Sequence, residues 1–209
     1  MENYQKILDK TIEKLNGGET LLLHSCCGPC SSYVLEYLAQ FFKITILFYN
    51  PNISPKNEFD KRVVEQKKVI EKTKAKYPID IIVDKYNPEE FYGRVEEYKD
   101  LGEKSRRCYE CYDLRIDRTF KIADEMGFDF VTTTLSVSPH KNSQWINEIG
   151  ENLEKVHKTR FLHSDFKKKN GYKRSIELSK EFDLYRQDYC GCVYSKKEAE
   201  QRHKNQENK

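Results

Sequence analysis

The chain has 209 residues, of which 37% are hydrophobic and 34% charged, and its formal net charge is +3. This length suits one domain, and so small a net charge means that nucleic-acid binding would need a local basic patch. The N-terminus has no apolar signal segment, and no apolar run approaches the ~20 residues of a membrane span. We therefore expect a cytoplasmic protein with reduced thiols and no membrane contact.

The first half of the chain predicts alternating helices and strands. In chain order we expect a helix over 2–16, a strand over 20–25, a helix over 29–40, a strand over 44–49, a helix over 55–76 and a strand over 79–83. Two glycines, Gly17 and Gly18, close the first helix, and Pro29 suits the first turn of the second.

The second half continues the alternation. In order we expect a short helix over 88–99, a helix over 109–126, a strand over 128–134, a helix from Ser138 to about 155, a strand over 159–163 and a basic helical remainder. The pattern predicts an α/β fold with a doubly wound parallel sheet of about five strands and a helical C-terminal segment. Residues 1–195 would form a single catalytic domain, and the charged tail 196–209 is expected to fray.

Ligands bind such sheets at the carboxyl ends of the strands. A group of cysteines follows the first predicted strand, Asn50-Pro51-Asn52 follows the second, and residues 136–141 follow the fourth. We expect these segments to converge on one edge. A second group of cysteines precedes the fourth strand, and it would reach the same edge only if its loop folds over.

All seven cysteines fall into three tight groups. The first is Cys26-Cys27-x-x-Cys30, the second Cys108-x-x-Cys111 and the third Cys190-x-Cys192. Clustered thiols in a reducing compartment indicate metal or redox chemistry. Seven thiols exceed the four ligands of one tetrahedral site, so the chain has more metal-binding capacity than one site needs.

Two other interpretations of these thiols stay open from the residues alone. The sequence CGPC over 27–30, between a strand and a helix, is typical of a thiol–disulfide oxidoreductase, because a helix N-terminus lowers the pKa of a thiol. The second and third groups alone would suit a structural zinc in an RNA-binding module. The first interpretation leaves five cysteines without a role, and the second leaves three.

The cysteine groups and their flanking residues together resemble the QueH family of epoxyqueuosine reductases. The matching segments are His24–Cys30, Tyr49–Ile53 with Glu58 and Arg62, Arg107–Tyr112 with Arg115, Thr132–Lys141, Gly171-Tyr172 and Tyr185–Cys192. They occur in the family's order over about residues 21–195, and their combination is far more specific than any one of them.

The resemblance implies a cobalamin-independent enzyme that reduces the epoxide of a modified guanosine, at the anticodon wobble position of tRNA, to the alkene of queuosine. It also implies a fold related to the adenine-nucleotide α-hydrolase (HUP) group, a [4Fe-4S] cluster beside a mononuclear iron, and an external electron donor. The metal ligands would be Cys26, Cys27, Cys30, Cys108, Cys111, Cys190 and Cys192.

The resemblance also suggests which thiols bind which metal. Cys108 and Cys111 are expected on the cluster with one thiol from each other group. Cys30 is expected on the iron, because some relatives have Asp there and both residue types bind iron.

The expected catalytic residues are Cys30, Arg186 and Gln187. The expected substrate contacts are Asn50, Glu58, Arg62, Ser138, Lys141 and Tyr189. Tyrosines beside the cysteines are candidates for stacking on a flipped base, and the basic run 167–174 for binding phosphates.

Overall fold

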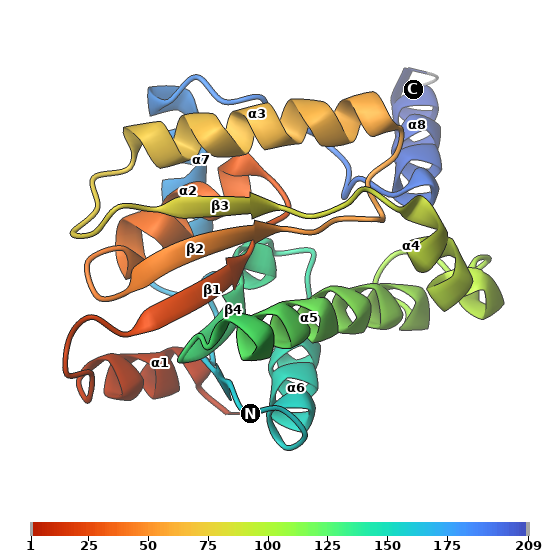
Figure 1. Cartoon of the computed structure of the whole chain (residues 1–209). Coiled ribbons are helices and arrows are strands. Elements are labelled where there is room, and N and C mark those ends of the chain that lie inside the picture. Colours follow the sequence, from red (N-terminus) through yellow and green to blue (C-terminus); the bar gives the residue numbers. More distant parts are fainter. Residues whose placement is uncertain (1, 208–209) are drawn as a thin grey trace.

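The computed structural model describes residues 2–207 and confirms the α/β fold (Figure 1). The strands are β1 (Thr20–His24), β2 (Lys43–Phe48), β3 (Asp80–Val83), β4 (Phe130–Thr133) and β5 (Arg160–Phe161). They form one sheet in the order β3-β2-β1-β4-β5, and every neighbouring pair is parallel. The chain thus winds outward in both directions from β1, as the alternating pattern predicts.

Helices cover both faces of this sheet (Figure 1). Side chains of α1 (Tyr4–Ile12), α2 (Gly28–Leu38), α3 (Lys56–Lys72) and α7 (Gly171–Glu181) share one hydrophobic core. Side chains of α5 (Arg106–Met126) and α6 (Ser143–Glu154) share the other core with the opposite face. The two cores explain why the central strands read as continuous apolar runs.

The three leucines of strand β1 contribute side chains to both hydrophobic cores. Leu21, Leu22 and Leu23 are fully buried, and successive side chains of a strand point to opposite faces. Leu21 and Leu23 accordingly belong to the core under α2, while Leu22 belongs to the core under α5. Burying each leucine contributes about 1.5–3 kcal/mol, so this strand is held firmly at the centre of the sheet.

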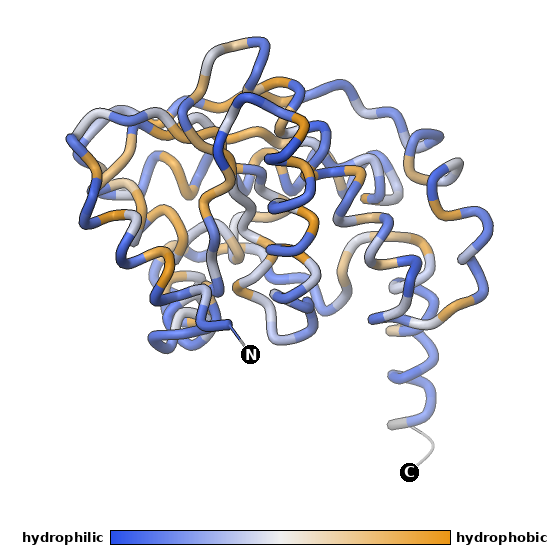
Figure 2. The backbone as a smooth tube through the Cα atoms, turned by 90° about the horizontal axis from the view of Figure 1, so that it is seen from below, coloured by the Kyte–Doolittle hydropathy of each residue, from blue (hydrophilic) through white to orange (hydrophobic). Residues whose placement is uncertain are grey.

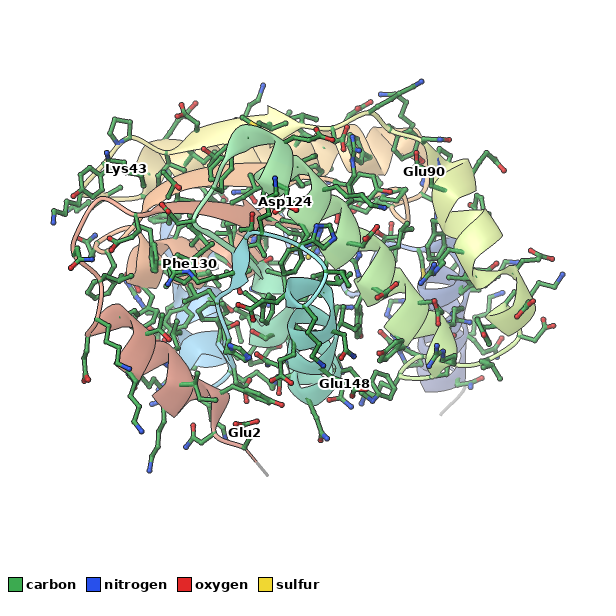
Figure 3. All side chains as sticks on the ribbon, turned by 60° about the horizontal axis from the view of Figure 1, so that its bottom comes forward. Glu2, Lys43, Glu90, Asp124, Phe130 and Glu148 are labelled. Carbon is green, nitrogen blue, oxygen red and sulfur yellow. The ribbon has the colours of Figure 1, made fainter. Side chains whose placement is uncertain are left out.

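The remaining elements lie beyond the carboxyl ends of the strands. These are α4 (Pro88–Val95), the 3-10 helices η1 (Glu96–Tyr98) and η2 (Thr134–Val137), and α8 (Val193–Glu207). Lys43 and Phe130, which begin β2 and β4, lie at one end of the molecule, and Glu90 of α4 lies at the other (Figure 3). The Tyr49 hydroxyl, just past β2, donates to the Glu90 carboxylate and ties α4 to this edge.

The structure corrects three predicted boundaries. The helix expected from Ser138 begins at Ser143, because the side chain of Asn142 accepts from the backbone N–H of Gln144 at 2.9 Å and caps the helix there. Residues 138–142 are therefore a loop. Helices α1 and α3 end at Ile12 and Lys72, before the predicted residues 16 and 76.

The charged tail that was expected to fray is helical as far as Glu207. Its Ala199 is buried, and its Glu198 pairs with Arg107 at 2.8 Å, so α8 is attached to the start of α5. The segment is largely hydrophilic and extends away from the rest of the chain (Figure 2). Among residues 2–207, no helix has both the length and the apolar character needed to cross a membrane.

Candidate metal centre and active site

The first cysteine group lies where β1 passes into α2. Cys26 is in the connecting turn, Cys27 is the N-cap of α2 and Cys30 lies in its first turn. The three sulfur atoms lie within 4.8 Å of one another, and the Sγ atoms of Cys26 and Cys27 are 4.0 Å apart. Cys26 and Cys27 are buried, whereas Cys30 is partly exposed. The close approach of α2 to α3 at Gly28, where an added Cβ would lie 3.0 Å from the Glu65 carbonyl oxygen, keeps this turn tight.

The second group occupies the first two turns of α5. Because α5 leads into the parallel strand β4, its N-terminus lies at the carboxyl edge of the sheet. Cys108 and Cys111 therefore reach that edge directly. The sequence-based expectation that a loop must fold over to bring them there was wrong.

The third group lies in the loop between α7 and α8, and it meets the second. Cys108, Cys111, Cys190 and Cys192 line one small cavity. The structure thus divides the thiols into a set of four and a set of three. This grouping differs from the sequence-based expectation, in which one thiol of the first group and one of the third joined Cys108 and Cys111.

The loop of the third group is held by the turn between β2 and α3. The backbone N–H of Ser54 donates to the carbonyl of Gly191 at 2.9 Å, and Arg62 Nη1 donates to the carbonyl of Cys190 at 3.1 Å. Gly191 has φ +125°, and a Cβ there would lie 2.9 Å from Arg62 Nη1. Only glycine suits this position, because it combines a left-handed backbone with a close neighbour.

A larger cavity of about 720 Å³ opens beside the first group. All three predicted catalytic residues line it, namely Cys30, Arg186 and Gln187. Of the predicted substrate contacts, Ser138, Lys141 and Tyr189 line it as well. Cys190 lines both cavities, so the set of four thiols and the larger cavity share a wall.

The other three predicted substrate contacts do not line either cavity. Asn50 is buried and its Nδ2 donates to the Ser25 carbonyl at 2.8 Å, which joins the ends of β1 and β2. Glu58 pairs with Arg62 at 2.7 Å beneath the third cysteine group. In this structure they support the backbone of the site instead of facing the cavity.

A model of the family described as epoxyqueuosine reductase QueH matches residues 21–198, the part of the chain that carries all seven thiols and every lining residue of the two cavities except Arg202. The chain belongs to the QueH family. It is 43% identical over 200 residues to the epoxyqueuosine reductase QueH of Streptococcus pyogenes serotype M1, covering 93% of this chain and 78% of that protein.

Two further relatives carry the same name. The protein of Staphylococcus aureus is 41% identical over 200 residues, with 92% of this chain and 83% of the relative covered. The protein of Thermotoga maritima is 36% identical over 189 residues, with 88% and 94% covered. The likeness to the QueH family therefore extends over most of each chain and is not confined to the cysteine motifs.

The three thiols of the first group shift one another's pKa values. Hydrogen bonds with Cys26 and Cys30 hold the pKa of the Cys27 thiol well below its usual value, and the charge of Arg62 acts in the same direction. Hydrogen bonding to Cys26 and Cys27, together with burial, raises the pKa of Cys30. One thiolate, centred on Cys27 at the N-terminus of α2, is thus already favoured in the metal-free protein.

Three of the four thiols that line the small cavity have pKa values above their usual range. Burial raises the pKa of Cys111 to about 12, although the nearby Arg115 opposes the effect, and burial also raises the pKa of Cys108 and Cys192. Arg115 is itself buried, and its Nε donates to the Cys111 carbonyl at 2.9 Å. Such a group of thiols needs a metal to displace the protons.

Asn52 is a site residue that the sequence analysis missed. It lines the cavity of the four thiols, is 2% exposed, and neither its Oδ1 nor its Nδ2 has a hydrogen-bond partner among the described residues. Unpaired buried amides are costly, so this side chain fits a ligand in the cavity. Asn52 belongs to the segment Asn50-Pro51-Asn52 that follows the second strand, but the sequence analysis predicted only Asn50 as a site residue.

Three of the five cations in the basic run 167–174 are paired with carboxylates. Lys167 pairs with Asp165 at 3.0 Å, Lys169 with Asp9 at 2.8 Å and Arg174 with Glu36 at 2.7 Å. These ion pairs join loops and helices of the fold. The run therefore presents less charge to phosphates than its sequence suggests.

Proposed function

We propose that this chain is a cytoplasmic epoxyqueuosine reductase that converts epoxyqueuosine at the wobble position of tRNA to queuosine. The observation that carries the proposal is the arrangement of seven thiols along the walls of two adjoining cavities, in a chain of the QueH family. The names of the relatives supply the reaction, and the larger cavity offers room for a flipped nucleotide.

Two metal groups fit these donors. Cys108, Cys111, Cys190 and Cys192 would hold a [4Fe-4S] cluster, a proposal supported by four thiols in one cavity and by the unpaired amide of Asn52. The first group would hold a mononuclear iron, supported by the short distances between its sulfur atoms. When bound, the cluster supplies single electrons and the iron supplies a Lewis acid for the epoxide oxygen.

The side chains of the larger cavity bind and orient the substrate in this proposal. Gln187 Oε1 is buried at the cavity without a partner among the described residues, so it can accept a hydrogen bond from a substrate hydroxyl or ammonium group. Ser138 and Arg186 offer donors from the facing loops. The Tyr189 ring, 5.5 Å from Arg62 Cζ, is fixed at the wall and suits stacking on a base.

The partners follow from the same cavity and reaction. Lys104, Arg186 and Arg202 line the cavity, and these cations favour the phosphates of an anticodon loop. The reaction consumes two electrons and two protons, and it releases water as the alkene forms. No flavin or nicotinamide motif is found in the sequence, so an external electron donor is part of the proposal.

The test uses protein purified without oxygen. Iron, sulfide and zinc are measured first, and about five irons and four sulfides per chain are expected. The protein is then given a chemical reductant and tRNA that carries epoxyqueuosine, and the nucleosides are analysed by mass spectrometry. A product that has lost one oxygen atom supports the proposal, whereas iron-loaded protein that leaves the epoxide intact would overturn it.

The metal analysis also separates the other interpretations. One zinc without sulfide, after cluster assembly has been attempted, would favour an RNA-binding module. Metal-free protein that reduces disulfides through Cys27 and Cys30 would favour a thiol–disulfide oxidoreductase.

A further inference from the structure

Lys141 makes an unusual contact in the loop between η2 and α6. Its Nζ lies 2.7 Å from the Sγ of Cys190. The other hydrogen bonds that a cysteine sulfur accepts come from the backbone N–H of Ser195, which donates to Cys192, and from a thiol within the first group. Among the side chains that the structure describes, Lys141 is thus the charged one that donates to a cysteine sulfur.

Both partners of this contact are anchored. The Lys141 backbone N–H donates to the Ser138 carbonyl at 3.1 Å, and the Lys141 carbonyl accepts from Lys167 Nζ at 3.3 Å. The Lys141 ammonium also lies 5.5 Å from the ring centroid of Tyr112. On the other side, Arg62 holds the carbonyl of Cys190. Because donor and acceptor are each fixed by other contacts, the hydrogen bond is built into the site.

The contact lies at the wall shared by the two cavities. Cys190 lines both of them, and Lys141 lines the larger one. Of the set of four thiols, the one that also faces the larger cavity is therefore the one whose sulfur accepts a hydrogen bond from a lysine.

We propose that Lys141 is a positioning residue that raises the reduction potential of the cluster through its hydrogen bond to the sulfur of Cys190. The inference rests on the proposed function, because it needs the cluster on the set of four thiols. Reduction adds one negative charge to a cluster, and hydrogen bonds and positive charge at its sulfur atoms favour that state. A charge-assisted hydrogen bond is the stronger kind, and this one is partly buried.

This role differs from the substrate contact that the sequence analysis assigned to Lys141. A lysine that only binds substrate changes the KM and leaves the potential of the substrate-free protein unaltered. A lysine that acts on Cys190 changes the potential before any tRNA is added. The two roles are therefore separated by a measurement without substrate.

The experiment is a redox titration of the tRNA-free protein, followed by the electron paramagnetic resonance signal of the reduced cluster. Lys141→Met and Lys141→Gln are each expected to shift the midpoint potential to a more negative value, and Lys141→Arg to shift it less. Arg202→Met is the matched control, since Arg202 also lines the larger cavity but is exposed on α8 and has no hydrogen bond to a sulfur of the described residues. Its potential should equal that of the wild type.

An unchanged midpoint potential in Lys141→Met would overturn the inference, as would an equal shift in Arg202→Met. Loss of the cluster from all three Lys141 variants, with circular dichroism unchanged, would also overturn it and make Lys141 an assembly residue. Iron and sulfide content of the wild type is measured beforehand. If the wild-type protein assembles no cluster, the cofactor assignment itself is refuted. If it assembles a cluster whose midpoint potential does not change in Lys141→Met, only the inference about Lys141 is refuted.

Discussion

Arg62 of α3 donates from Nη1 to the carbonyl oxygen of Cys190 at 3.1 Å, and so connects the first half of the chain to the loop that carries the last two thiols. The guanidinium is 1% exposed, and its Nε also pairs with Glu58 at 2.7 Å. A buried cation needs such partners. The position of Cys190 therefore depends on a side chain far away in the sequence.

Replacing Arg62 with Met should destabilise the fold and the metal site together. The change leaves the Glu58 carboxylate without its partner, and breaking a buried pair costs about 3 kcal/mol. We expect this loss in urea unfolding of the reduced metal-free protein, with lower iron and sulfide content after assembly. Lys56→Ala is the control, because its pair with Asp60 on the same helix is exposed and should change stability by less than about 0.5 kcal/mol. Equal stability of the two variants would contradict this account.

Gly191→Ala should weaken the same loop. A non-glycine residue at φ +125° is strained, and its Cβ would contact Arg62 Nη1 at 2.9 Å, so we expect a loss of about 1–3 kcal/mol. Gly93→Ala provides the comparison, since Gly93 lies inside α4 with open space around it, and alanine there should stabilise by about 0.5–1 kcal/mol. Thermal unfolding of both variants measures the difference, and a stabilised Gly191→Ala protein would refute the expected strain.

The division of the thiols predicts different effects of single cysteine variants. Cys111→Ser should remove the visible absorption of the proposed cluster, since that thiol belongs to the set of four. Cys30→Ala should keep this absorption but lose one iron and the reductase activity, since that thiol belongs to the first group. Iron and sulfide analysis of each variant checks the assignment. Bleaching of the cluster in Cys27→Ala would show instead that the first group contributes a cluster ligand.

Gln187→Leu should reduce activity without changing the metal content. The unpaired Oε1 at the cavity is expected to accept a hydrogen bond from the substrate, and losing one such bond costs about 1–3 kcal/mol, or roughly 5- to 150-fold in kcat/KM. Gln201→Leu, an exposed change on α8, should have normal kinetics. Steady-state assays with epoxyqueuosine tRNA measure both. Normal kcat/KM in Gln187→Leu would exclude the residue from substrate binding.

His24 should make the stability of the metal-free protein depend on pH. Its ring contacts Thr133 Oγ1 at 2.8 Å and the Tyr49 carbonyl at 3.1 Å, and burial, followed by the charge of Arg115, lowers its pKa to about 4. The unfolded chain binds a proton near pH 6.5 and the folded chain only near pH 4, so stability falls as the pH falls through this window. The loss amounts to about 3 kcal/mol at completion.

The measurement is denaturant unfolding of metal-free protein between pH 4 and 8. His24→Gln should be less stable at pH 7 but should have a shallower slope below pH 6.5. His203→Gln, at an exposed position, should keep the slope of the wild type. Parallel curves for His24→Gln and the wild type would contradict the assignment of this proton.

The sequence by itself determined the class of fold and the chemistry. Apolar runs such as Leu21–Leu23 mark buried strands, because a strand covered on both faces has no polar side. Gly127 follows the predicted helix 109–126 and ends α5 in the left-handed conformation that glycine favours. The three cysteine groups indicated metal chemistry, because ligands of one metal are often separated by one or two residues. Both are local patterns, and local patterns can be read along a chain.

Only the tertiary structure decided which thiols share a cavity and which polar residues face it. The meeting of the second and third cysteine groups depends on long-range contacts, such as that of Arg62 with Cys190, which no local propensity encodes. The same holds for Lys141, whose ammonium lies against a sulfur instead of pointing freely at substrate. A sequence motif identifies the residues that belong to a site, but the distances between their side chains are set by the packing of the folded chain.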